Sequence, residues 1–218
     1  MTLADPLRVV LVGAGLMGRA WRDTIEAAPD VELAGIADID PATAEATAAT
    51  LGRPVPTGTD GVALAAATGA RAIVNATVPE AHHPVTTAAL FAGLDVLGEK
   101  PVAPTVAEAL SLAAASEVTG RLFMVSQSRR WNPQLFALRA MAEDLGTPGS
   151  LTTEFFREAH FPGFREEMAH PLLVDMRSTR STRPGSCSAP NPCRRTASRT
   201  TRRGAGSRAT QRPPPCSR

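Results

Sequence analysis

Short apolar runs rich in β-branched residues alternate with helix-like segments along the first 126 residues of this 218-residue chain. Strands are predicted at residues 8–12, 31–37, 71–76, 95–98 and 122–126. Helices are predicted at residues 16–28, 41–51, 85–92 and 105–116. Strands that alternate with helices form parallel sheets, because each crossover packs a helix onto the sheet. The pattern therefore predicts an α/β fold with a doubly wound parallel sheet.

The last 42 residues, 177–218, have a different composition. They contain 11 arginines, all three cysteines and no acidic residue, and they lack Val, Ile, Leu, Met, Phe and Trp. Such a segment cannot bury enough apolar surface to offset the entropy lost on ordering, so we expect a disordered basic tail. Residues 1–176 have 12 basic and 21 acidic side chains, a formal charge of −9, and must provide the core.

A second, incomplete unit is predicted between the sheet and the tail. Residues 132–145 have a helical pattern, 146–149 form a turn and 151–157 have strand character. This α+β unit meets the tail before it can complete a sheet. We therefore predict three parts, an α/β domain, an incomplete second domain and a tail, at residues 1–123, 124–176 and 177–218.

Several classes of protein are not expected. No apolar run approaches the roughly 20 residues of a membrane span, and the N-terminus lacks the basic and apolar regions of a secretory signal. A body without cysteine fits a cytoplasmic protein. Neither the three tail cysteines nor His160 and His170 have the spacing of metal ligands, so no metal is predicted.

The first predicted strand leads directly into a glycine motif. Gly13 permits a tight turn, Gly15 lets backbone amides approach a pyrophosphate, and Gly18 allows close packing of the helix on the strand. The helix N-terminus adds partial positive charge for the phosphates. This context predicts a dinucleotide-binding domain of the Rossmann type, the alternative being a glycine turn that binds nothing. The motif reads Gly13-Ala14-Gly15-Leu16-Met17-Gly18.

Asp38 stands at the end of the second predicted strand, 20 residues after Gly18. A carboxylate there can accept hydrogen bonds from both hydroxyls of the adenosine ribose and would repel a 2′-phosphate. We therefore predict NAD as the cofactor, with NADP less favoured. The alternative is that Asp38 is a solvated strand end, with nearby Asp40 as the better helix cap.

Lys100 is the only lysine in a chain with 22 arginines, and it follows the predicted strand at 95–98. Ligands of doubly wound sheets bind at the carboxyl ends of the strands. Lysine can release its proton at workable pH and arginine cannot, so a single lysine at this edge indicates proton transfer. The alternative is a solvated surface lysine.

Together these features resemble the Gfo/Idh/MocA family, which is named after glucose–fructose oxidoreductase, inositol dehydrogenase and a rhizopine-catabolism protein. The resemblance covers residues 1–176. It rests on Asp38, the glycine motif and the segments 77–83, 99–101, 127–133 and 168–176.

The resemblance implies an NAD(P)-dependent oxidoreductase that transfers a hydride between nicotinamide and a sugar, polyol or related hydroxy compound. Lys100 would be the acid/base for the substrate hydroxyl, and Glu99 would position the nicotinamide ribose. Pro101 would follow a cis peptide that aims the lysine. Thr77 and Pro79 would lie against the cofactor.

The resemblance assigns further positions less directly. His83 matches a position that the family often fills with histidine, whereas His82 and His83 can equally cap a helix. Arg130 would lie near the substrate. Asp175 would begin a catalytic D-x-x-x-H motif whose histidine is replaced by Thr179. Intact family members associate through the second domain, so a homo-oligomer is implied for them.

Three functions therefore remain open. The chain can be an oxidoreductase that lacks the second-domain histidine and binds cofactor with little or no turnover. It can also be a non-catalytic NAD-binding module that is indifferent to Lys100→Ala. A nucleic-acid-binding arm at 177–218 is the least favoured, because its arginines are not interleaved with aromatic residues.

The break after Met176 predicts that the tail is the gene read out of frame, which would truncate the family sequence there. If one base is restored after the Met176 codon, the first base of each tail codon becomes the middle base of a restored codon. An arginine codon CGN then supplies a middle C, and codons with a middle C encode Ser, Pro, Thr or Ala. One such reading supplies histidine at position 179, completing D-x-x-x-H after Asp175. We expect the coding DNA to show this open frame; a shifted frame interrupted by stops would contradict it.

Overall fold

The structure is a computed structural model that describes residues 5–144 and residue 166. The turn expected at 146–149, the strand at 151–157, Asp175 and the tail at 177–218 lie outside the described residues. The helix expected at 132–145 is present as α6, Pro133–Asp144, after a short 3-10 helix, η1, at Ser128–Trp131.

The described residues form one six-stranded sheet in which all paired strands are parallel. The strand order is β3-β2-β1-β4-β5-β6. This order confirms the predicted α/β class and the Rossmann-type, doubly wound arrangement. The strands are β1 (Leu7–Val12), β2 (Val31–Ala37), β3 (Thr57–Gly58), β4 (Ala72–Asn75), β5 (Asp95–Gly98) and β6 (Phe123–Val125).

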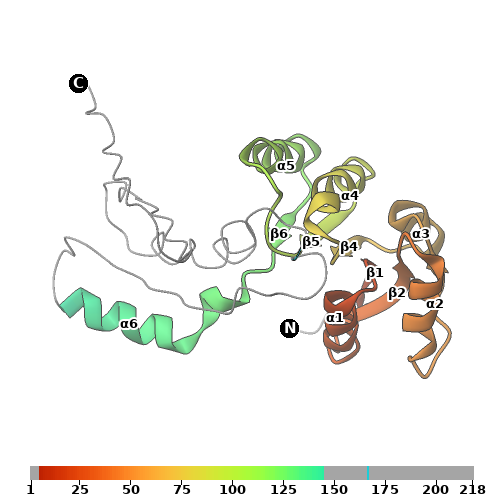
Figure 1. Cartoon of the computed structure of the whole chain (residues 1–218), viewed down its shortest axis with the longest axis horizontal. Helices are drawn as coiled ribbons and strands as arrows, with labels where there is room; N and C mark the ends of the chain where they lie inside the picture. The colour runs from red at the N-terminus through yellow and green to blue at the C-terminus, as the bar shows by residue number, and fades with distance from the viewer. Residues whose placement is uncertain (1–4, 145–165, 167–218) are drawn as a thin grey trace, which may run out of the picture. The chain divides into compact units, whose positions relative to one another are not determined.

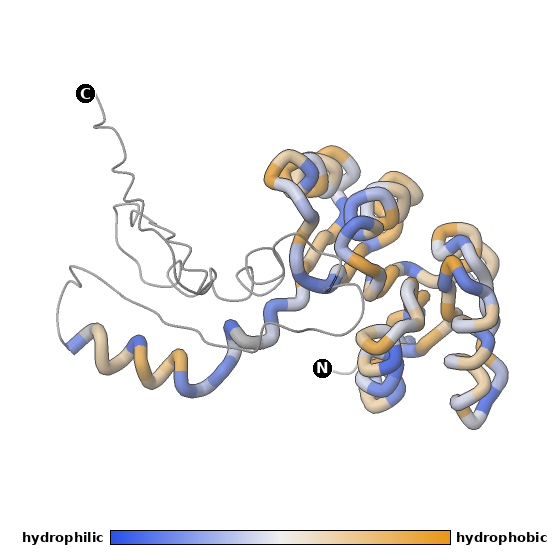
Figure 2. The backbone as a smooth tube through the Cα atoms, viewed as in Figure 1, coloured by the Kyte–Doolittle hydropathy of each residue, from blue (hydrophilic) through white to orange (hydrophobic). Residues whose placement is uncertain are grey.

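Helices cover both faces of the sheet (Figure 1). One face packs against α1 (Leu16–Glu26) and α2 (Pro41–Ala49). The opposite face packs against α3 (Gly61–Thr68), α4 (Pro79–Phe91) and α5 (Val106–Thr119). Hydrophilic and hydrophobic residues mix along these helices, as Figure 2 shows.

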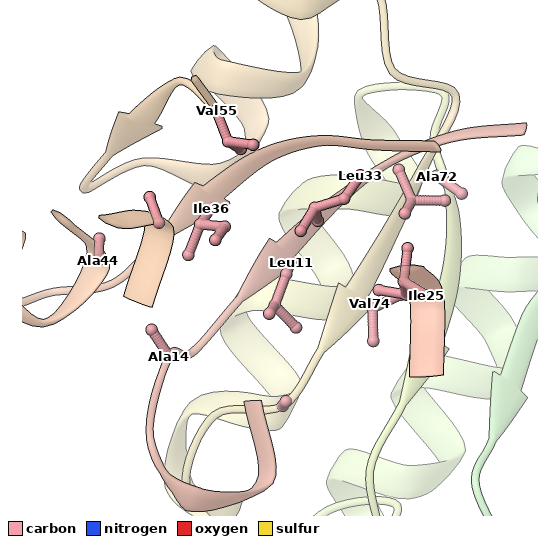
Figure 3. Close-up of a cluster of buried hydrophobic side chains, with 12 residues drawn as sticks. Leu11, Ala14, Ile25, Leu33, Ile36, Ala44, Val55, Ala72 and Val74 are labelled. Atoms are coloured by element: carbon pink, nitrogen blue, oxygen red, sulfur yellow. The ribbon is translucent and has the colours of Figure 1, made fainter. Parts of the chain in front are cut away.

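The alternation of side chains along β1 divides the core into two layers. Val9 and Leu11 join the cluster under α1 and α2, and Val10 and Val12 join the cluster on the other face. Both clusters are needed because a parallel sheet is buried on both faces. Figure 3 shows the first cluster, with Leu11 at its centre between Ile36 and Val74.

Three elements were not predicted: β3, α3 and the 3-10 helix η1. β3 has only two residues, and α3 is rich in alanine, which leaves no apolar stripe to mark a helical period. The ends of α3 do carry signals: the Asp60 carboxylate accepts from the backbone N–H of Val62, and Gly69 ends the helix with φ 66°. α4 also begins six residues earlier than the helix predicted at 85–92, and Pro84 lies inside it.

Two helices begin with side-chain caps, and the cap at Asp40 was expected from the sequence. The Asp40 carboxylate accepts from the backbone N–H of Ala42 at the start of α2. A hydrogen bond from the Thr43 hydroxyl, the largest cause, lowers the pKa of Asp40, and the Ala42 amide contributes in the same direction. Thr105 and Glu108 form a capping box at the start of α5.

No helix among residues 5–144 is both long enough and apolar enough to cross a membrane.

Truncation of a core side chain tests the assignment of the central strands. Leu33 on β2 is 1% exposed, and we expect Leu33→Ala to lower the free energy of unfolding by about 2–5 kcal/mol because it leaves a cavity. Leu110→Ala on α5, where the side chain is 66% exposed, is the matched control and should change it by about 0.5 kcal/mol or less. Urea unfolding of both variants measures the difference, and equal losses would contradict the assignment.

Candidate functional site

The predicted site residues follow four strands whose carboxyl ends meet at one edge. The pairing registers of neighbouring strands put Val12 beside Ala37 and Asn75, and Asn75 beside Gly98. Between β1 and β4 the strand order reverses, since β2 and β3 lie to one side and β5 and β6 to the other. The loops after β1 and β4 therefore diverge, which opens the crevice where doubly wound sheets bind ligands.

The three glycines of the motif have different surroundings. Gly13 has φ +92°, and a Cβ there would come within 2.7 Å of the Ala76 carbonyl carbon and the Thr77 nitrogen. A Cβ on Gly18 would collide with the Gly13 carbonyl. A Cβ on Gly15 would meet no atom within 4 Å, so packing does not require glycine there. The space above Gly15, the N-cap of α1, is open to a ligand.

The turn of the motif is held by the strands and helix beside it. The Gly13 amide donates to the Ala37 carbonyl at 2.8 Å, and the Ala14 amide donates to Asp38 Oδ2 at 2.7 Å. The buried hydroxyl of Thr47 on α2 lies 3.3 Å from the Ala14 carbonyl oxygen and donates to it. The amides at the start of α1 receive no side-chain cap, so they can bind an anion.

Asp38 is half-buried, and each of its carboxylate oxygens accepts one backbone hydrogen bond. Oδ2 accepts from Ala14, and Oδ1 accepts from Asp40 at 3.0 Å. The carboxylate is therefore fixed beside the glycine turn, and its remaining lone pairs can accept from ribose hydroxyls. Asp40, not Asp38, caps α2.

Several apolar side chains at this edge are exposed. Leu16 and Met17, in the first turn of α1, are 76% and 45% exposed, and Ile39, next to Asp38, is 93% exposed. Val78, after β4, is 46% exposed. Cofactor sites combine such apolar surface with a few oriented polar groups, and this edge has both.

A buried polar network begins at Asn75, the last residue of β4. The Asn75 side-chain amide donates to the Thr86 hydroxyl at 3.1 Å and to the His82 carbonyl at 3.3 Å. The Asn75 Oδ1 accepts from the Thr77 hydroxyl at 2.6 Å. Asn75 thus links β4 to the first turns of α4 and sets the path of the loop that carries Thr77 and the buried Pro79.

The two adjacent histidines of α4 lie in different environments. His82 is 3% exposed; its Nδ1 lies 2.7 Å from the Pro101 carbonyl oxygen and its Nε2 lies 3.1 Å from the Thr77 carbonyl oxygen. A carbonyl oxygen only accepts, so the ring makes both bonds only when both nitrogens carry hydrogen. His83 is half-buried, and its Nε2 lies 3.1 Å from the Ser111 hydroxyl of α5.

The segment after β5 contains Glu99, Lys100 and Pro101. Glu99 is 8% exposed, and the Trp21 indole Nε1 donates to its Oε1 at 2.8 Å. The Lys100 backbone amide donates to Glu99 Oε2 at 3.0 Å. Lys100 itself is half-buried, and the Lys100–Pro101 peptide is cis, as expected.

The remaining predicted residues are Arg130, Asp175 and Thr179. Arg130 is exposed on η1, beyond β6. Asp175 and Thr179 are outside the described residues. Within the described part of the chain no three His, Cys, Asp or Glu side chains are grouped as a metal site would require.

Two residues of this edge, Asn75 and Trp21, were not singled out for a role in the site. Asn75 and Trp21 resemble ordinary members of a strand and an amphipathic helix. Their polar contacts join segments 11 and 78 residues apart in sequence. His82 was considered only as a cap or a cofactor contact. The sequence did not show which of His82 and His83 is buried, because that depends on where α4 begins.

The strand order, the glycine turn at the switch point and the fixed Asp38 together define a dinucleotide-binding Rossmann domain. Residues 7–127 match the Gfo/Idh/MocA family, which is described as an oxidoreductase family with an NAD-binding Rossmann fold. The chain belongs to this family and is related to its inositol dehydrogenases.

Three relatives illustrate the similarity. Inositol 2-dehydrogenase 4 of Saccharopolyspora erythraea is 33% identical over 166 residues, 74% of this chain and 49% of that protein. The structure of GenD2 from gentamicin A biosynthesis in complex with NAD is 27% identical, with a TM-score of 0.60 over 69% of this chain and 42% of that chain. A 3-ketoreductase from Actinomadura kijaniata in complex with NADP is 26% identical, with a TM-score of 0.58 over 64% of this chain and 43% of that chain. This chain spans about half the length of the curated relatives it matches.

The adjacent histidines provide a matched test of the buried network. We expect His82→Ala to lower the free energy of unfolding by about 1–3 kcal/mol, because it leaves the Thr77 and Pro101 carbonyls without the imidazole. His83→Ala removes one contact at a partly exposed position and should cost clearly less, about 0.5 kcal/mol. Urea unfolding at constant pH compares the two, and similar costs would show that the carbonyl contacts of His82 add no stability.

Proposed function

We propose that this chain binds NAD at the carboxyl edge of its sheet and descends from an NAD-dependent dehydrogenase of sugars, polyols or related hydroxy compounds. The observation that carries this proposal is the pairing of the Asp38 carboxylate with the glycine turn. It holds the Asp38 carboxylate beside the uncapped N-terminus of α1. A dinucleotide needs such an acid for its adenosine ribose and such a helix end for its pyrophosphate.

The negative charge of Asp38 favours NAD over NADP. A 2′-phosphate on the adenosine ribose would meet this carboxylate, whereas the 2′-hydroxyl of NAD can donate to it. Because relatives with NAD and with NADP are both known in structures, membership of the family does not decide the choice. In this proposal the carboxylate at position 38 sets the preference for NAD.

Lys100 is the proposed acid/base. It follows β5 on the same edge, it is half-buried, and its backbone is fixed by the Glu99 carboxylate. A bound nicotinamide would accept the hydride, and the Lys100 amine would accept the proton of the substrate hydroxyl. Thr77, after β4, and Pro79, at the start of α4, would lie against the cofactor, and Glu99 would position the nicotinamide ribose.

Residues beyond the first domain complete this activity in the proposal. Arg130 would contact the substrate from η1, and Asp175 would begin the second-domain motif whose histidine is replaced by Thr179. We place the end of the first domain near residues 123 and 124, within β6. Because position 179 lacks the histidine, we propose that the chain binds cofactor with little or no turnover. A non-catalytic NAD-binding module is the second candidate, supported by the same cofactor edge. An intact relative would be expected to assemble as a homo-oligomer.

Titration of the 218-residue chain with NAD and NADP by calorimetry tests the cofactor site. We expect NAD to bind and Asp38→Ala to weaken it by about 10- to 100-fold, because a hydrogen bond to a charged group is worth about 1.5–3 kcal/mol. The same variant should also lower the ratio of the NAD affinity to the NADP affinity, since it removes the negative charge of Asp38 that repels a 2′-phosphate. Asp23→Ala, at an exposed position on α1, is the control. Equal effects of the two variants would refute the role of Asp38.

The same preparation tests turnover. With NAD and myo-inositol we expect no NADH above the rate of the Lys100→Ala variant, because position 179 lacks the imidazole. Substrate-dependent NADH formation that is lost in Lys100→Ala would establish the chain as an active dehydrogenase and contradict this expectation.

A further inference from the structure

The Glu99 carboxylate joins two segments that are far apart in sequence. Trp21 lies on α1, three residues after Gly18, and its indole Nε1 donates to Glu99 Oε1 across 78 residues of sequence. The other oxygen, Oε2, accepts from the backbone amide of Lys100. One buried carboxylate therefore contacts both the helix that follows the glycine turn and the residue proposed as acid/base.

We propose that Trp21 is a positioning residue for Lys100: its indole N–H pins the Glu99 carboxylate, and the pinned carboxylate fixes the Lys100 backbone. This inference deepens the proposed function and rests on the role given there to Lys100. It assigns to Glu99 an internal task, in addition to the nicotinamide ribose contact that the family resemblance implies.

The indole is well placed for this task because its own position is determined by packing. Trp21 is half-buried, and its ring packs against the core cluster that contains Leu11, Ile25 and Val74. A rigid ring held by the core points its single N–H in one direction. The donor therefore remains aimed at Glu99 without the rotamer freedom of a longer polar side chain.

The buried carboxylate in turn depends on its donors. Glu99 is 8% exposed, so water can satisfy little of its charge, and a buried carboxylate needs hydrogen bonds to remain in place. It receives one from Trp21 and one from the Lys100 amide. Removing the indole N–H leaves an oxygen unsatisfied, which favours rotation of the carboxylate away from the Lys100 amide.

Each residue of the segment 99–101 makes a polar contact through a backbone atom. The Glu99 amide donates to the Asn75 carbonyl at 2.9 Å, the Lys100 amide donates to Glu99 Oε2, and the Pro101 carbonyl oxygen lies beside His82 Nδ1. The first and third contacts come from β4 and α4. The contact of the Lys100 amide runs through Glu99 to the Trp21 side chain of α1, the helix that follows the glycine turn.

The single lysine makes the test specific. Reductive methylation of the full chain with ¹³C-formaldehyde labels the Lys100 amine and the N-terminal amine, and methylation keeps the positive charge of lysine. Comparison with Lys100→Arg assigns the Lys100 methyl resonance. The variants are Trp21→Phe, which keeps an aromatic ring without the N–H, Glu99→Gln, and the double variant. Trp131→Phe is the control, because the only other tryptophan is 71% exposed on η1.

We expect Trp21→Phe to move the Lys100 methyl resonance toward its position in the urea-unfolded chain while the far-UV circular dichroism stays that of the folded protein. Trp131→Phe should leave the resonance in place. If Trp21 acts through Glu99, the double variant shifts the resonance no further than the larger of the two single shifts. A folded Trp21→Phe chain with an unmoved resonance, or shifts that add in the double variant, would overturn the proposal.

Two further measurements separate this inference from the proposed function. The resonance of the unliganded chain reports the Trp21–Glu99–Lys100 link whether or not NAD binds. Addition of NAD to the labelled wild type tests the proposed function, because no heat of binding and no shift would refute the cofactor site alone. If Trp21→Phe does not fold, Glu99→Gln decides. Its side chain has one accepting oxygen for two donors, so its N–H₂ group must face the Trp21 indole or the Lys100 amide, and an unmoved resonance in this variant refutes the link.

Discussion

The close approach of the Gly13 turn to the backbone of Ala76 and Thr77 is the contact on which the rest of this site depends. A side chain at position 13 would come within 2.7 Å of both residues. Because β1 and β4 are neighbours at the point where the strand order reverses, their loops must pass each other here before they diverge. Glycine at 13 and again at 18 lets the turn, α1 and the β4 loop share this space, and the crevice follows from it.

Buried polar groups then fix the segments around that turn. Asp38 holds the Ala14 amide, Asn75 holds the first turns of α4, and Glu99 holds the Lys100 amide. Each of these side chains makes at least one hydrogen bond to another segment: Asp38 accepts from the turn after β1, Asn75 donates to α4, and Glu99 accepts from Trp21 on α1. The cofactor edge of the domain is therefore built from side chains that stabilise its loops as well as from residues free to meet a ligand. A dehydrogenase needs this rigidity, since hydride and proton transfer depend on the relative position of groups on separate loops.

Much of the fold could be predicted because its signals are local. The strand at 31–37 was predicted as the structure has it, and the other strand and helix bounds except that of α4 differ by a few residues. The cis peptide before Pro101 was implied by the family resemblance and not by a local signal. α3 was missed because a helix of small residues has no hydrophobic period, and α4 was placed too late because Pro84 lies inside it. The cap signals of α3 were present in the sequence at Asp60 and Gly69, whereas α4 continues through Pro84 against the local pattern. Among the predicted site residues, the structure gives hydrogen-bond partners to Gly13, Asp38, Thr77, His83 and Glu99. Their roles toward cofactor and substrate are proposals.

The sequence by itself determined the class of fold, the family and the edge where chemistry is expected, because strand–helix alternation, the glycine motif and a solitary lysine are properties of short segments. Only the tertiary structure decided which of two adjacent histidines is buried against Thr77 and Pro101, and which tryptophan reaches Glu99. The physical reason is that a hydrogen bond to a buried group is set by the direction of a side chain after the helices have packed on the sheet. Residues 21 and 99 meet only when β1, β4 and β5 lie side by side, and no local pattern in the chain specifies that meeting.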